Sequence, residues 1–178
     1  ELDRITGGRV LLKAENLQQT GSFKIRGAYN LLSQLGPDQV KKGAVAYSSG
    51  NHAQAVAAAA RVVGFTAAII MPQDAPKAKV DGTQEQGGEV IFYNREKESR
   101  EKIGTRLANE RKATIVPPYD DPDVIAGQGT VGLEAASQAL AEDMIPDTAL
   151  IPCGGGGLVA GCSIALKTQF PSIRIHPV

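Results

Sequence analysis

The chain has 178 residues, enough for one domain or two small lobes around a buried core. Its 19 basic and 19 acidic residues give a formal net charge of zero, so the composition indicates neither a nucleic-acid nor a membrane-surface partner. The two cysteines are too few for a disulfide framework or a zinc site, and a chain without tryptophan must build its core mostly from Ala, Val, Ile and Leu.

Strands and helices are predicted to alternate along the chain. Short apolar runs that end at turn residues predict strands, and longer runs with apolar residues at helical spacing predict helices. The predicted strands are 10–12, 43–48, 66–71, 89–93, 114–116, 149–152 and 173–178. The predicted helices are 22–35, 53–63, 76–86, 95–111, 124–140 (with a break near Gly127 to Gly129) and 158–170. Because the strands are too apolar for either face of the sheet to be exposed to solvent, we expect an α/β fold with open, parallel, doubly wound sheets covered by helices on both sides.

The segment from Asn16 to Ala28 places a lysine at the start of a helix. Ser22 is the predicted N-cap, so Lys24 lies in the first turn. The helix dipole disfavours a cation at that end. Such a lysine either points into water, as most lysines do, or has a lowered ammonium pKa, which is what a Schiff-base amine needs.

Two turns lie at the carboxyl ends of predicted strands, where open parallel sheets bind ligands. In Ser48 to His52, free N–H groups at a helix start would suit a carboxylate, although Ser and Asn are also ordinary turn residues. The N–H groups of Gly154 to Gly157 can converge on a phosphate. Four consecutive glycines lose much conformational entropy on folding, and a turn that only packs a helix on a strand does not require that cost. Taken alone, His52 is interpreted as a structural histidine and Cys153 as a small buried hydrophobe.

Other classes of protein fit parts of this pattern. No Lys-Ser or Lys-Thr pair directly follows the glycine run, so it is not a nucleoside-triphosphate loop. The spacing Gly155-x-Gly157-x-x-Ala160 can be aligned with a dinucleotide fingerprint, but a nicotinamide oxidoreductase leaves Lys24 and Ser49 unexplained. A non-catalytic ligand-binding domain is a further alternative, and the intact lysine, asparagine and glycine positions argue against it.

Three segments, in this order, carry a resemblance to a known family. Thr20–Ala28 (TGSFKIRGA), Ser48–Gln54 (SSGNHAQ) and Gly154–Leu158 (GGGGL) closely resemble the serine/threonine dehydratase and serine racemase family. These are pyridoxal-phosphate enzymes with the two-lobed, tryptophan-synthase-beta-like fold type II. The likeness extends over essentially all 178 residues and includes Val124–Thr130. His52 separates this chain from the related cysteine synthases, which usually have threonine there.

The resemblance implies a role for each matched position. Lys24 would hold pyridoxal 5'-phosphate as a Schiff base and remove the substrate α-proton, and Ser49 would face it from the other side of the cofactor. Phe23 would pack near the pyridine ring and Asn51 would bind the ring hydroxyl. The phosphate would lie on Gly154, Gly155, Gly156 and Gly157, and the substrate carboxylate on Ser48, Ser49, Gly50, Asn51 and His52.

The implied reaction is that of an ammonia-lyase, or dehydratase. A small L-hydroxy amino acid would lose its β-hydroxyl and give a 2-keto acid and ammonia, and serine racemase activity in the same site is the alternative. Threonine, serine and 3-hydroxyaspartate are all allowed. Arg95 and Arg26 are candidate partners for a second substrate carboxylate, but a solvated surface position is the favoured interpretation of both.

The resemblance also implies how the chain is organised. The larger cofactor lobe would comprise residues 1–44 and 120–178, and the smaller lobe residues 45–119. The chain is expected to be incomplete at both ends, with the partner of the pyridine nitrogen and any divalent-cation site outside it and no metal site in this stretch. We expect a cytoplasmic homodimer or higher homo-oligomer, with a small amino acid as its ligand and neither nucleic acid nor membrane as a partner.

Overall fold

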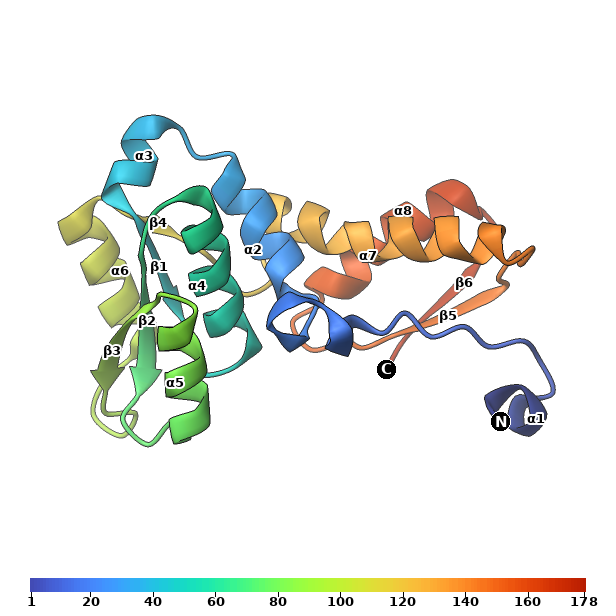
Figure 1. The fold of residues 1–178 in the computed structure, drawn as a ribbon, viewed down its shortest axis with the longest axis horizontal. Helices are drawn as coiled ribbons and strands as arrows, with labels where there is room; N and C mark the ends of the chain where they lie inside the picture. The colour runs from blue at the N-terminus through green and yellow to red at the C-terminus, as the bar shows by residue number, and fades with distance from the viewer.

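The computed structural model describes all 178 residues. Its larger sheet has four parallel strands in the order β3-β2-β1-β4 (Figure 1). These strands are β1 (Ala44–Tyr47), β2 (Ala67–Pro72), β3 (Glu89–Tyr93) and β4 (Thr114–Ile115). Each forms where a short apolar run predicted it, within one or two residues, and the predicted parallel arrangement is confirmed.

Helices cover both faces of this sheet, which confirms the doubly wound pattern. Alternate residues of a strand point to opposite faces, so Ala46 and Ile69 pack in the cluster shared with α2 and α4, whereas Val45 and Ile70 pack with α6. Burial on both faces explains why the strands show no alternation of apolar and polar residues. The helices around this sheet are α2 (Lys24–Ser33), α4 (Asn51–Val63), α5 (Lys77–Glu85) and α6 (Arg100–Arg111).

A second pair of strands lies at the other end of the molecule (Figure 1). Strands β5 (Thr148–Ile151) and β6 (Arg174–Pro177) are parallel, and Ile151 packs with the second hydrophobic core. Helices α7 (Pro122–Ala141) and α8 (Gly157–Gln169) run beside them and pack closely on each other. The assignment of 1–44 with 120–178 to one lobe and of 45–119 to another stays a prediction.

Helix α7 is continuous through Gly127 to Gly129, so the predicted break is wrong. These glycines are contact points between helices. A Cβ at Gly127 would lie 2.5 Å from the carbonyl oxygen of Arg26 in α2, and one at Gly129 would lie 3.0 Å from that of Gly161 in α8. The glycines therefore let three helix backbones approach each other, and this packing outweighs their low helix propensity.

The N-terminal segment departs most from the prediction. Val10 to Leu12, predicted as a strand, is irregular, because no other strand lies beside it, and Leu11 and Leu12 are exposed. Short helices that the pattern did not predict occur nearby. They are α1 (Leu2–Thr6), the 3-10 helices η1 (Glu15–Leu17) and η2 (Gln19–Gly21), and α3 (Pro37–Lys42).

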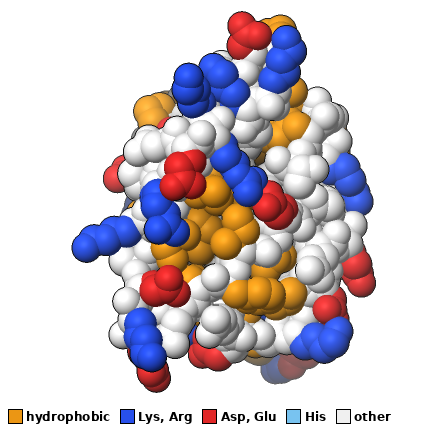
Figure 2. Space-filling model, turned by 90° about the vertical axis from the view of Figure 1, so that its left-hand side faces the viewer, with side chains coloured by type: hydrophobic (Ala, Val, Ile, Leu, Met, Phe, Trp, Pro, Cys, Tyr) orange, Lys and Arg blue, Asp and Glu red, His pale blue; other side chains and the backbone are white.

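Figure 2 looks onto the side of the four-stranded sheet and shows apolar side chains gathered between charged ones. Phe92 of the edge strand β3 is half exposed, and Arg111 holds Glu89 of the same strand through two short contacts of 2.5 and 2.9 Å. Charged residues beside an edge strand reduce its tendency to pair with another chain. No helix in the structure has the length and apolar character that a membrane span requires.

Candidate active site

Lys24 lies in the first turn of α2, as predicted, and is the first residue of the helix. Its amine donates a hydrogen bond to the carbonyl oxygen of Pro118 and lies 5.2 Å from the centre of the Phe23 ring. The side chain is partly buried, and this burial lowers the pKa of Lys24 because the charged ammonium loses hydration. Of the two states open to a lysine in this position, the structure therefore favours the desolvated amine.

The chain enters α2 differently from the prediction. Phe23, not Ser22, occupies the N-cap position, and no side chain caps the helix. The Ser22 hydroxyl is buried without a hydrogen-bond partner, as is that of Thr20. Thr20 also has φ +64°, a left-handed conformation that a β-branched residue rarely adopts. The turn before Lys24 is thus held in place by contacts with other parts of the chain rather than by its own capping.

The glycine turn joins β5 to α8 and ends with Gly156 as the N-cap of α8, at φ +88°. None of the N–H groups from Gly154 to Leu158 donates a hydrogen bond within the chain. A row of free N–H groups at the start of a 13-residue helix suits an anion, since the helix dipole adds to the attraction. A phosphate on Gly154 to Gly157 fits these donors.

One cavity, of about 140 Å³, brings the lysine and the glycine turn together. Phe23, Lys24 and Gly154 to Gly157 all line it. Five further residues line it that were not predicted as site residues, which are Pro118, Tyr119, Gln128, Pro152 and Leu158. Pro118 and Tyr119 come within three residues of the end of the predicted strand 114–116, so their position at the ligand-binding edge of the sheet was the available signal.

Tyr119 lies directly against the glycine turn. A Cβ on Gly155 would overlap its ring, and one on Gly157 would lie 2.7 Å from its carbonyl oxygen. Close packing against Tyr119 is thus a second reason for glycine at these two positions. Gly154 and Gly156 have no atom within 4 Å of a Cβ, so space does not require glycine there.

The turn from Ser48 to His52 follows β1 and begins α4, as predicted, but its residues do not line that cavity. The N–H groups of Ser49, Asn51 and His52 donate no hydrogen bond, so they are available to a carboxylate. The Gly50 N–H donates to the Ser48 hydroxyl at 3.2 Å. The side chains of Ser49 and Asn51 make no hydrogen bond within the chain and stay available to a ligand.

His52 connects this turn to the lysine. Its Nε2 lies 2.9 Å from the carbonyl oxygen of Val116, two residues before Pro118, and its Nδ1 is buried without a partner. The pKa of His52 is lowered to about 4, mainly by burial and to a smaller extent by the Lys24 charge, and these effects outweigh the raising effect of the Val116 carbonyl. His52 is therefore neutral near pH 7, and only one of its two ring nitrogens has a hydrogen-bond partner within the chain.

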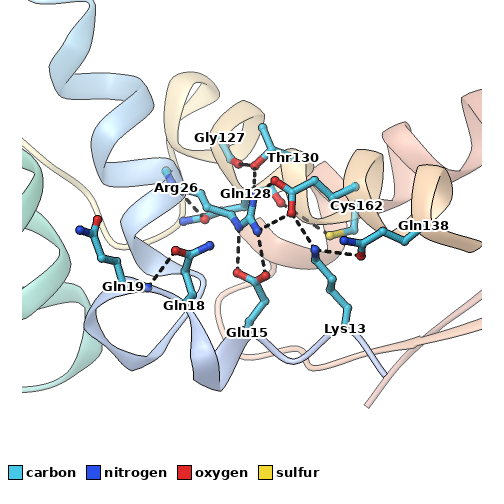
Figure 3. A network of polar contacts seen from close by, with 12 residues as sticks. Lys13, Glu15, Gln18, Gln19, Arg26, Gly127, Gln128, Thr130, Gln138 and Cys162 are labelled. Carbon is cyan, nitrogen blue, oxygen red and sulfur yellow. Dashed lines mark hydrogen bonds and ion pairs between the residues drawn. The ribbon is translucent and has the colours of Figure 1, made fainter. Parts of the chain in front are cut away.

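The surroundings of three other residues can be compared with what the sequence predicts. Arg26 is not solvated and not free for a substrate, because its side chain is 10% exposed and its donors are taken by Glu15, Glu134 and Thr130 (Figure 3). Arg95 is exposed, as expected, and pairs with Asp74 at 2.9 Å. Cys153 is exposed, so its interpretation as a buried hydrophobe is wrong, and Cys162 is the buried cysteine.

A desolvated lysine beside a row of unused N–H donors, at the carboxyl edge of a parallel sheet, defines a class of α/β protein that holds a phosphorylated ligand next to an amine. Comparison with known proteins identifies the family within this class. The family described as "Pyridoxal-phosphate dependent enzyme" matches residues 1–178, and the chain belongs to it. The match confirms the predicted family and cofactor, and the nicotinamide alternative for the glycine run is wrong.

Individual relatives agree with the family match. Over 178 residues the chain is 48% identical to the L-threo-3-hydroxyaspartate ammonia-lyase of a Pseudomonas species, covering 99% of this chain and 54% of the relative. Over 176 residues it is 45% identical to the L-threonine ammonia-lyase of Thermotoga maritima, covering 98% of this chain and 42% of the relative. The solved structure of maize serine racemase superposes with a TM-score of 0.92 at 42% identity, covering 98% of this chain and 52% of that one. The fold type II prediction is confirmed, and the chain spans about half the length of the relatives it matches.

Proposed function

We propose that this chain forms the lysine- and phosphate-binding part of a pyridoxal-phosphate-dependent ammonia-lyase for a small L-hydroxy amino acid, either threonine, serine or 3-hydroxyaspartate. The products are a 2-keto acid and ammonia. The observation that carries the proposal is the single cavity in which the desolvated Lys24 amine meets the unused N–H groups of the glycine turn. The printed names of the relatives support this reaction type, and they differ in substrate.

The residues present fit the cofactor. The glycine turn would hold the phosphate through its N–H groups, Phe23 would offer a ring face at the cavity wall, and Lys24 would supply the amine for linkage to the aldehyde carbon. Asn51 offers a free side-chain amide to the ring hydroxyl. When bound, pyridoxal phosphate supplies an electron sink for the bonding electrons of the substrate α-carbon.

The chain's own residues then carry the proton transfers. The Ser48–His52 turn binds the substrate carboxylate through the free N–H groups of Ser49, Asn51 and His52. Lys24, whose pKa is lowered by burial, has an enlarged neutral fraction and takes the α-proton at Nζ. Pro118 and Tyr119 line the same cavity, and the Pro118 carbonyl oxygen accepts a hydrogen bond from this amine.

Serine racemase activity is the second candidate, supported by the structural match to maize serine racemase. Reprotonation from the opposite face needs a second acid–base group, and the free hydroxyl of Ser49 is the candidate. The predicted cytoplasmic location, homo-oligomeric state and lobe boundaries stay proposals that rest on the resemblance.

Ammonia and keto-acid release by the purified protein tests the proposal. L-threonine, L-serine and L-threo-3-hydroxyaspartate are supplied separately with added pyridoxal phosphate, beside the same protein carrying Lys24→Ala. Release from at least one of them, lost in the variant by several orders of magnitude, is the expected result, because one amine serves as both anchor and base. Bound cofactor without release from any of the three would instead support a non-catalytic binding domain.

A further inference from the structure

Arg26 lies at the centre of a polar network (Figure 3), and neither Arg26 nor the residues that accept its hydrogen bonds line the cavity. Its Nε and Nη2 donate to the two carboxylate oxygens of Glu15, both at 2.8 Å, and its Nη1 and Nη2 donate to those of Glu134 at 2.7 and 2.8 Å. Its Nη1 also donates to the Thr130 hydroxyl at 3.1 Å. All five N–H donors of the guanidinium therefore have acceptors. Lys13 joins the network through Glu134 at 2.7 Å, so the charges of the two cations and two anions balance.

This network connects three separate parts of the chain. Glu15 belongs to η1, Arg26 to the first turn of α2 and Glu134 to α7. The Glu15–Arg26 pair closes the loop that contains Thr20, with its strained φ of +64°, and Lys24. Because α2 has no side-chain cap, this pair is one of the polar contacts that hold the entrance of the helix.

The other side of the same turn is fixed by close backbone packing. The N–H group of Gly27 donates to the Gln128 side chain of α7 at 3.1 Å, and a Cβ on Gly27 would lie 2.7 Å from the Val124 carbonyl oxygen. Helix α7 in turn packs through Gly129 on Gly161 of α8, the helix that begins at the glycine turn. Helix α7 is thus the common support of the lysine and of the phosphate-binding turn.

We propose that Arg26 is a positioning residue that sets the Lys24 amine relative to the glycine turn by clamping the first turn of α2 to η1 and α7. Residues two apart on a helix do not face each other, so Arg26 acts through the shared turn and does not touch the cofactor. The hydrogen bonds from Arg26 and Lys13 lower the pKa of Glu134 to about 2, so this carboxylate is charged near neutral pH. The inference rests on the proposed role of Lys24.

Arg26→Lys is the informative variant, because it keeps the charge but replaces the planar fork with a single ammonium. Arg111→Lys is the matched control, since Arg111 makes a similar forked pair with Glu89 on the four-stranded sheet. Glu15→Gln is the second variant. It weakens only the ion pair between Arg26 and η1. The inference therefore stays testable if Arg26→Lys fails to fold.

Three readouts are taken on the purified protein. They are the dissociation constant for added pyridoxal phosphate, the pH at which the absorbance of the bound cofactor changes, and kcat and KM for ammonia release. We expect Arg26→Lys to raise the dissociation constant for pyridoxal phosphate about tenfold and to lower kcat about tenfold. KM should stay within about threefold, since a small misplacement of a reacting group costs rate more than substrate binding. The pH of the absorbance change should move, and Glu15→Gln should show the same pattern in weaker form.

Arg111→Lys should match the wild type in all three readouts. Wild-type values in folded Arg26→Lys and Glu15→Gln would overturn the inference. So would a uniform fall in melting temperature with unchanged absorbance and kcat, because that result would make the network merely structural. If the wild-type cofactor is not attached to Lys24 at all, the proposed function itself fails, and borohydride trapping of the wild type reveals this independently.

Discussion

Lowering the pH should destabilise the protein through His52. The imidazole is buried, its pKa is about 4 in the folded protein, and the ordinary value is 6.5. Between these two values the unfolded chain binds a proton that the folded protein does not, so the stability that neutral His52 contributes is present above pH 6.5 and is lost as the pH falls. The full difference of 2.5 between the two pKa values corresponds to ~3 kcal/mol.

The same two pKa values predict the course of the loss. The free energy of unfolding should fall by about 2 kcal/mol by pH 5 and by about 3 kcal/mol by pH 4, relative to neutral pH. His52→Gln provides the comparison, because glutamine keeps an N–H donor for the Val116 carbonyl but does not titrate. Urea unfolding of both proteins from pH 8 to pH 4 should show the wild type losing this much more stability than the variant, while ordinary carboxylates contribute equally to both.

An NMR titration of the imidazole ring checks the cause directly. The chain has two histidines, so His176→Asn assigns the remaining ring signals to His52. A midpoint near pH 4 is expected. A midpoint at pH 6 or above, or equal acid sensitivity of wild type and His52→Gln, would refute the reasoning from burial.

Three further predictions concern the packing and the proposed site. Gly161→Ala should lower the free energy of unfolding by about 3 kcal/mol in urea titrations, because its Cβ would lie 2.6 Å from the backbone nitrogen of Gly129; Gly8→Ala, with open space around it, should change stability by less than about 0.5 kcal/mol. Gly154→Asp should weaken the binding of pyridoxal phosphate at least about tenfold in a fluorescence titration, because it adds a negative charge without a clash, whereas the isosteric Gly154→Asn should keep most of the affinity; equal loss in both would remove charge from the explanation. Ser49→Ala should abolish any interconversion of L- and D-serine, followed by chiral chromatography, and should leave measurable keto-acid release; continued racemisation at the wild-type rate would show that Ser49 is not the second-face group.

The sequence predicts the alternation of strands and helices from β1 onward because buried parallel strands and their helices differ in length and end at Gly or Pro. The run from Ala53 to Val63 illustrates this, since it is too long for a strand and too apolar for a surface helix. Local patterns fail where tertiary contacts decide. Val10 to Leu12 is apolar enough for a strand but has no neighbouring strand, and Gly127 to Gly129 remains helical because neighbouring backbones need the space.

The candidate site shows the same division. Lys24 and the glycine turn are recognisable because each stands at the edge of an element where its residue type is unusual. Arg26 is not recognisable as buried, because its acceptors Glu15 and Glu134 are 11 and 108 residues away in sequence. No local pattern identifies such partners, so the network is visible only in the folded chain.

The attachment point of the cofactor is the central claim, and borohydride reduction tests it directly. The purified protein is loaded with pyridoxal phosphate, reduced with borohydride and digested, and the labelled peptide is identified by mass spectrometry. The label is predicted on the peptide containing Lys24, with none in the Lys24→Ala variant. Label on Lys13, which is engaged with Glu134, or on the exposed Lys41 would contradict the assignment of the site.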